Sequence, residues 1–209
     1  MRANNPKHTY SHLLLGSVFY ISLLFPGLVR ADTATPGGPL EAIKATVDQV
    51  VAINESLPGD ASLTQRREKL RAVITPRFDF DEMARRSLGT NWSAINADQQ
   101  AEFVKVFSDL LAKTYLARVE SAKTGMVKIE NEKITPGNPS VAVVKTQVMS
   151  KGDSFPIDYK LVDEHGTWKV YDVVIENIGL IVNYRNEFSG IIRKDKFDGL
   201  MARLRERAA

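Results

Sequence analysis

The hydrophobic residues of this chain change their spacing twice, and these changes restrict the folds that it can adopt. From about residue 40 to residue 121 they recur every three or four residues, as in amphipathic helices, and Pro76 and Gly89 mark helix ends. From about residue 125 to residue 176 they alternate as in half-buried strands. The helical spacing then returns up to residue 207. The order of helices, sheet and helices predicts an α+β domain.

The helical regions divide at turn-forming residues. We expect helices at about 40–57, 62–74, 79–88 and 97–121, and two more at about 178–194 and 197–207. Asn96 with Gln99 three residues later forms a capping-box pattern before the fourth helix. The alternating acids Asp79 and Asp81 are interpreted as an acidic helix start, because a calcium loop would also need a central glycine and a final glutamate.

Four segments with alternating hydrophobic residues predict the sheet: 125–134, 141–150, 155–162 and 167–176. Gly152-Asp153 is a two-residue hairpin turn, and residues 164–166 close the next connection. Short connections join antiparallel neighbours. We therefore expect a four-stranded antiparallel sheet, covered on one face by N- and C-terminal helices, with an apolar cavity between them.

The first 31 residues have the pattern of a signal peptide. Arg2 and Lys7 precede an apolar run over residues 13–29, and Ala31 follows at the expected cleavage point. An uncleaved membrane anchor is the alternative, although the run is short for a bilayer-spanning helix. Residues 32–39 are interpreted as a flexible connector, and residues 40–207 as one domain. We expect an exported protein with a cleaved signal peptide.

Charge and composition exclude several kinds of function. Residues 1–31 contain three of the 28 basic residues and none of the 25 acidic residues, which leaves 25 of each in the remainder. A nucleic-acid binder would keep a basic surface. The chain has no cysteine, and His165 is the one histidine beyond the expected signal peptide, so thiol chemistry, cysteine-bound metals and histidine-dependent hydrolysis are not expected. We expect no catalytic residue, metal site or cofactor.

Large apolar side chains occur in the predicted helices and in the sheet. They fit either a filled core or a cavity that takes up acyl chains through the hydrophobic effect, and both need the same residue types. The candidate cavity residues are Phe103, Phe107, Leu111, Tyr115, Val144, Val148, Tyr159, Leu161, Tyr171, Val173, Ile181, Tyr184 and Phe188.

Several segments of the chain, taken in order, have a recognisable pattern: Phe78-Asp79-Phe80-Asp81-Glu82-Met83-Ala84, Leu88-Gly89, Trp92, Gln100, Phe103, Phe107, Tyr115, Trp168-Lys169-Val170-Tyr171-Asp172-Val173, Asn183-Tyr184-Arg185-Asn186-Glu187-Phe188 and Phe197-Asp198-Gly199-Leu200. In their order and spacing these segments resemble the MlaC family, the auxiliary periplasmic components of phospholipid ABC transporters, also called toluene-tolerance proteins. The similarity covers about residues 40–205. One departure is Asn177-Ile178-Gly179, where the family usually has glycine, an aliphatic residue and serine.

The resemblance implies a periplasmic carrier that binds a phospholipid as cargo. Its partners would be an outer-membrane lipoprotein complex and an inner-membrane ABC transporter with a mammalian-cell-entry-type domain. A hopanoid-type lipid is an alternative cargo. Two other functions remain open: a small enzyme of the isomerase type that uses Asp158 or Asp172 with Tyr159 inside the cavity, and an envelope adaptor with no ligand.

Overall fold

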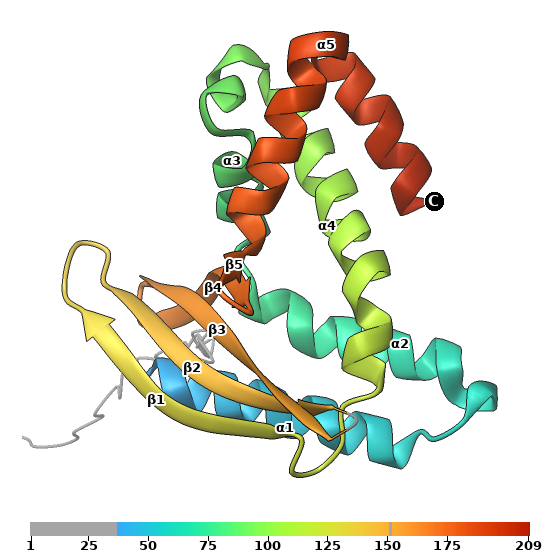
Figure 1. Cartoon of the computed structure of the whole chain (residues 1–209), viewed down its shortest axis with the longest axis vertical. Coiled ribbons are helices and arrows are strands. Elements are labelled where there is room, and N and C mark those ends of the chain that lie inside the picture. The colour runs from blue at the N-terminus through green and yellow to red at the C-terminus, as the bar shows by residue number, and fades with distance from the viewer. Residues whose placement is uncertain (1–36, 151) are drawn as a thin grey trace, which may run out of the picture. The chain divides into compact units, whose positions relative to one another are not determined.

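A computed structural model describes residues 37–150 and 152–209 of the chain, and this part has the predicted α+β order (Figure 1). The predicted signal peptide and most of the predicted connector lie outside the described residues. The longer helices are α1 (Pro39–Ser56), α2 (Leu63–Ile74), α3 (Phe80–Leu88), α4 (Ala97–Glu120) and α5 (Leu180–Ala208). The strands are β1 (Val127–Thr135), β2 (Val141–Ser150), β3 (Asp153–Glu164), β4 (Thr167–Ile175) and β5 (Ile178–Gly179).

The sheet is antiparallel, and in the described part of the chain it has five strands in the order β1-β2-β3-β4-β5. The prediction of four strands was therefore wrong in number. The extra strand, β5, pairs with the end of β4 through a turn at Glu176 and Asn177, whose φ angles are 48° and 66°. Positive φ at both central positions is the geometry of a tight hairpin turn. A strand of two residues shows no alternation, and Ile178 also fits the apolar pattern of the following helix.

One face of the sheet carries the larger apolar residues. In β2 and β3 the pairs Val144–Tyr159 and Val148–Phe155 lie on this face, because paired residues share a face and successive residues alternate. Helix α1 packs along β1 and β2 on this side. Ile43 of α1 is buried with Val144, Leu161 and Val170, and we call these four residues the sheet cluster.

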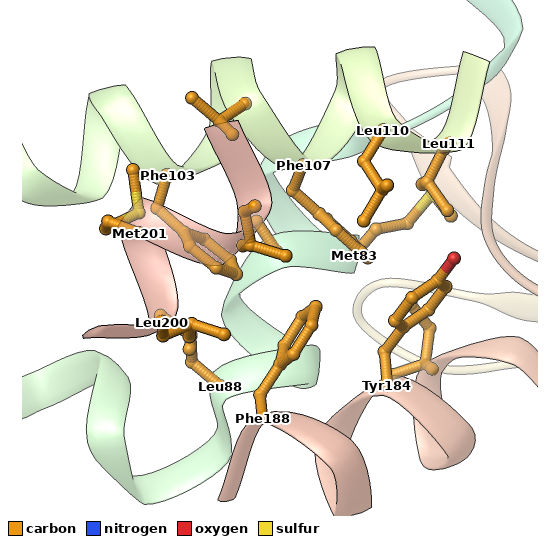
Figure 2. Packing of buried hydrophobic residues seen from close by; sticks show 14 of the residues in the cluster. Met83, Leu88, Phe103, Phe107, Leu110, Leu111, Tyr184, Phe188, Leu200 and Met201 are labelled. Carbon is orange, nitrogen blue, oxygen red and sulfur yellow. The ribbon is translucent and has the colours of Figure 1, made fainter. Parts of the chain in front are cut away.

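Helices α3, α4 and α5 pack mainly on one another and form a bundle that extends away from the sheet (Figure 1). Between α4 and α5, Phe103 and Phe107 point toward Tyr184 and Phe188 (Figure 2). The ring centroids of Phe107 and Tyr184 are 5.2 Å apart, and those of Phe103 and Phe188 are 5.8 Å apart, both edge to face. Each such pair contributes about 0.5–1.5 kcal/mol beyond its buried area. We call the buried residues of this bundle the helical cluster; its members are Met83, Ala84, Leu88, Phe103, Val106, Phe107, Leu110, Leu111, Leu180, Ile181, Tyr184, Phe188, Leu200, Met201 and Leu204.

The predicted helix boundaries have physical causes in the structure. The Asn96 side chain accepts a hydrogen bond from the Gln99 backbone at 2.9 Å, and the Gln99 side chain accepts one from the Asn96 backbone at 3.0 Å, which confirms the capping box. Asp79 accepts from the backbone N–H of Glu82 at the start of α3. Helix α5 is interrupted at Lys196, where φ is 61°, and its last part turns back on the bundle. This break lies close to the predicted division between helices at about 178–194 and 197–207.

Candidate functional site

A pocket of about 460 Å³ lies between the apolar face of the sheet and helices α2, α3 and α4. Val148, Phe155 and Ile157 form part of its floor, with Val173 and Ile175 from β4. The strand register pairs Ile157 with Ile175, which places these side chains on one face. The floor is therefore a continuous apolar surface, and its residues are half-buried because they face the pocket.

The opposite wall comes mainly from the C-terminal half of α4. Leu111, Tyr115 and Val119 recur every four residues, so they lie on one side of this helix. The N-terminal half of α4 directs Phe103 and Phe107 into the helical cluster instead. A single helix thus contributes to a closed core in its first half and to a pocket wall in its second half.

The structure places the thirteen candidate residues in different surroundings. Leu111, Tyr115, Val148, Tyr159 and Val173 line the pocket. The ring of Tyr171 lies beside the Arg86 guanidinium, whose carbon is 4.3 Å from the ring centroid. Contact of any of these residues with a ligand stays a prediction. The other seven lie in the two closed clusters: Phe103, Phe107, Ile181, Tyr184 and Phe188 in the helical cluster, and Val144 and Leu161 in the sheet cluster.

Other pocket residues were not among the candidates. Ile157 and Ile175 share a face with Tyr159 and Val173, so the alternation of residues along β3 and β4 would have identified them. Phe78 precedes α3 and Phe80 is its first residue, and their rings stack with centroids 5.8 Å apart. The hydrophobic spacing of the sequence does not show that these two residues line the pocket. Their position depends on how α3 packs on α4, α5 and β4.

Tyr159 brings a hydroxyl group to the apolar floor. The residue lines the pocket, and no hydrogen bond to the described residues contributes to the pKa of this hydroxyl. Burial raises the pKa of Tyr159 from its ordinary value of 10.0 to about 12, so the phenol is neutral at physiological pH. The pocket therefore has a polar but uncharged group at this point.

Asp79 lies between the pocket residues Phe78 and Phe80, at the start of α3. Burial and, to a smaller extent, the nearby carboxylate of Glu164 raise the pKa of Asp79 from 3.8 to about 6, against the lowering effect of the Glu82 backbone N–H. The carboxylate thus caps a helix while it lies in surroundings that disfavour its charge.

The two acids of the alternative enzyme hypothesis, Asp158 and Asp172, do not face the pocket. Asp158 and Asp172 occupy the alternate positions to Tyr159 and Val173, so they belong to the opposite face of the sheet. Asp172 is buried, where it accepts a hydrogen bond from the backbone N–H of Ile181 at 3.1 Å and pairs with Lys160 at 3.0 Å. Within residues 37–150 and 152–209, no carboxylate lines the pocket.

Two further properties hold for the described part of the chain. No group of three or more His, Cys, Asp or Glu residues is arranged there to bind a metal ion. None of the helices there has the length and apolar character needed to cross a bilayer. The fold and the site together define a small α+β protein with an apolar pocket between its sheet and its helices.

The comparisons with known proteins identify the group to which such a protein belongs. Residues 44–206 match the family described as MlaC protein. The chain belongs to the MlaC family, as the sequence resemblance indicated. Over 147 residues, 68% of each chain, it is 22% identical to the intermembrane phospholipid transport system binding protein MlaC of Haemophilus influenzae.

A solved structure supports the same relationship. The phospholipid-binding protein from Ralstonia solanacearum, solved in complex with a phospholipid, matches with a TM-score of 0.72 and 28% identity. The match covers 82% of this chain and 97% of that chain. Both relatives are named for binding, and neither name describes an enzymatic reaction.

The first prediction concerns the Tyr159 hydroxyl. Because this hydroxyl faces an open pocket and makes no bond to the described residues, Tyr159→Phe should raise the free energy of unfolding only slightly at pH 7, by less than about 1 kcal/mol. The difference should grow above pH 10, because a folded-state pKa of about 12 makes the wild type lose stability as pH rises toward that value. Urea unfolding at pH 7 and pH 10.5 measures both effects. A loss of stability at pH 7 would show that the hydroxyl is hydrogen-bonded in the folded protein.

The second prediction concerns Asp79. Because the pKa of Asp79 is higher in the folded state than its ordinary value of 3.8, binding of a proton stabilises the folded protein. This contribution to the free energy of unfolding is complete below pH 3.8 and is lost as pH rises through about 6. Asp79→Asn keeps a capping oxygen and removes the charge, so it should be more stable than the wild type at pH 7, by up to about 1 kcal/mol after allowance for solvent screening. The gain should disappear near pH 4 in thermal unfolding.

The matched control is Asp81→Asn, which removes an exposed acid from the first turn of the same helix. This change loses a favourable interaction with the helix N-terminus and relieves no burial, so it should lower stability slightly at pH 7. A gain of equal size in both variants would mean that net charge, and not the burial of Asp79, causes the effect.

Proposed function

We propose that the chain is a phospholipid-binding carrier and that the pocket holds the acyl chains of its cargo. The observation that supports this most strongly is the pocket itself: about 460 Å³ of space with walls of alkyl and aromatic side chains. This volume lies within the ~300–1,000 Å³ range of ligand pockets. The relatives named for phospholipid binding support a binding and transport protein over an enzyme.

Apolar burial supplies the binding energy in this proposal. Each methylene group that moves from water into the pocket contributes about 0.8 kcal/mol. The floor from β2, β3 and β4 and the wall from α4 contact the chains without directional bonds, so chains of different structure fit the same surface. The polar headgroup stays where the pocket meets water, near the exposed lining residues Thr75 and Ser121.

The proposed setting is the periplasm, after removal of the predicted signal peptide at residues 1–31. In this setting the carrier moves lipid between an outer-membrane lipoprotein complex and an inner-membrane ABC transporter with a mammalian-cell-entry-type domain. The relative named as part of an intermembrane phospholipid transport system supports this role. The equal numbers of acidic and basic residues after residue 31 favour a carrier that is not held at anionic membrane surfaces.

The two alternative functions are less well supported. A ligand-free adaptor would have a filled interior, whereas the pocket volume exceeds the ~300 Å³ at which ligand sites generally begin. An isomerase-type enzyme would need a carboxylate beside Tyr159, and Asp158 and Asp172 belong to the other face of the sheet.

The third prediction tests which surface binds the lipid. Val148→Glu places a charge on the pocket floor, which should cost several kcal/mol of lipid binding because acyl chains would have to cover an unpaired carboxylate. Native mass spectrometry of protein purified from a bacterial envelope should show a bound phospholipid for the wild type and none for this variant.

The matched control is Met149→Glu. Met149 is the next residue of β2, points to the opposite face and is 42% exposed. This variant should keep its lipid. Equal lipid loading in the two folded variants would show that the pocket face does not bind the cargo, and a wild type that carries no lipid under gentle ionisation would contradict the proposed function.

A further inference from the structure

Two tyrosines line the pocket, Tyr159 on the floor formed by the sheet and Tyr115 on the wall formed by α4. A tyrosine hydroxyl can donate and accept hydrogen bonds, and polar groups inside a protein are nearly always hydrogen-bonded. The two hydroxyls differ in the groups that surround them within the described part of the chain. This difference indicates which of them is available to a ligand.

The hydroxyl of Tyr115 has polar neighbours. Burial raises the pKa of Tyr184 to about 12, and the nearby hydroxyl of Tyr115 contributes to this increase. The guanidinium carbon of Arg118 lies 5.6 Å from the centroid of the Tyr115 ring. The polar end of Tyr115 therefore already interacts with a second phenol of the protein.

Tyr159 has apolar surroundings instead. Its strand partners on the floor are Val144 of β2 and Val173 of β4. Its ring packs against the sheet cluster, and the surface that it still exposes faces the pocket. Burial is the one cause that raises the pKa of Tyr159, with no contribution from a charge or a hydrogen bond of the described residues. The hydroxyl is thus a neutral donor that faces the space where a ligand would lie.

The position of Tyr159 along the floor matters as well. Phe78, another lining residue, packs against the sheet cluster as Tyr159 does. The backbone N–H of Phe78 donates a hydrogen bond to the carbonyl oxygen of Thr75 at 3.2 Å, and Thr75 is an exposed lining residue. Tyr159 therefore lies inside the pocket, at the end of the floor where the chain also brings Thr75 to the lining.

A lipid that fills the pocket removes water from the phenol. Methylene groups alone would leave the hydroxyl without a hydrogen bond, which weakens binding. A lipid that places an acceptor at this point avoids that loss. In a phospholipid the phosphate is charged and stays in water, whereas the ester carbonyl oxygens are uncharged acceptors at the first carbon of each acyl chain.

We propose that Tyr159 donates a hydrogen bond to an ester carbonyl oxygen of the lipid, so that the pocket selects ester-linked acyl lipids over ether-linked alkyl lipids. This inference rests on the proposed function, and it adds a polar determinant to a site that otherwise binds through apolar contact. The ester joins the chains to the headgroup, and a donor inside the pocket near the exposed Thr75 matches that position.

The test compares two soluble lipids that differ at the ester. Delipidated mature protein is titrated by calorimetry with dihexanoylphosphatidylcholine and, separately, with its ether analogue, in which methylene groups replace the two carbonyls. The ratio of ester-lipid to ether-lipid affinity should be about fivefold higher for the wild type than for Tyr159→Phe, the value of one neutral hydrogen bond. In the variant the carbonyl loses its donor, and the ether lipid no longer covers an unbonded hydroxyl.

Tyr115→Phe is the matched control, because it also removes a phenol hydroxyl from the pocket lining, but one that lies beside Tyr184. It should change the two affinities by the same factor, so the ratio should stay within about twofold of the wild-type value.

Infrared spectroscopy gives a second measurement. With ¹³C at the ester carbonyl carbons, the C=O stretching band of the bound lipid should lie at lower frequency in the wild type than in Tyr159→Phe, because accepting a hydrogen bond weakens the C=O bond. A purely structural role of Tyr159 would not change this band.

Three results would overturn the inference while the proposed function stands: the same affinity ratio in Tyr159→Phe and in the wild type, an equal fall of the ratio in Tyr115→Phe, or a C=O band at the same frequency in both complexes. Failure of the wild type to bind either lipid would instead contradict the proposed function.

Discussion

The aromatic contacts between α4 and α5 determine how the rest of the molecule is arranged. Phe103 and Phe107 bury their rings against Tyr184 and Phe188, so the two helices satisfy much of their apolar surface within the bundle. They do not need the sheet for that purpose. The sheet is covered by α1 near Val144, and the floor around Val148 and Ile157 remains open. The pocket exists because the chain has two separate closed clusters and a gap between them.

This division explains how a small domain combines stability with a ligand site. The helical and sheet clusters stabilise the fold. The pocket lining consists mostly of half-buried residues, joined by Met83, Leu111 and Leu180 of the helical cluster. Helix α2 has a single buried residue, Leu70, and two ion pairs join it to α4.

Hydrophobic spacing in the sequence was sufficient to predict the elements and the antiparallel order, and the capping box at Asn96 was identified from two residues. The two-residue strand β5 was missed because it is too short to show a period. The pocket was harder to define. Tyr115 and Phe107 lie on the same broad apolar face of α4, yet one lines the pocket and the other is fully buried. Their chemistry is alike, and only the tertiary arrangement of α5 and the sheet separates them.

The central claim is that the gap between the two clusters holds acyl chains. A crystal structure of the protein loaded with a phospholipid that carries brominated acyl chains tests it most directly, because bromine gives an anomalous signal that locates the chain. The account predicts bromine peaks between the floor at Val148 and Ile157 and the α4 wall at Leu111 and Tyr115. Bromine peaks elsewhere on the protein, with the gap occupied by water, would contradict it.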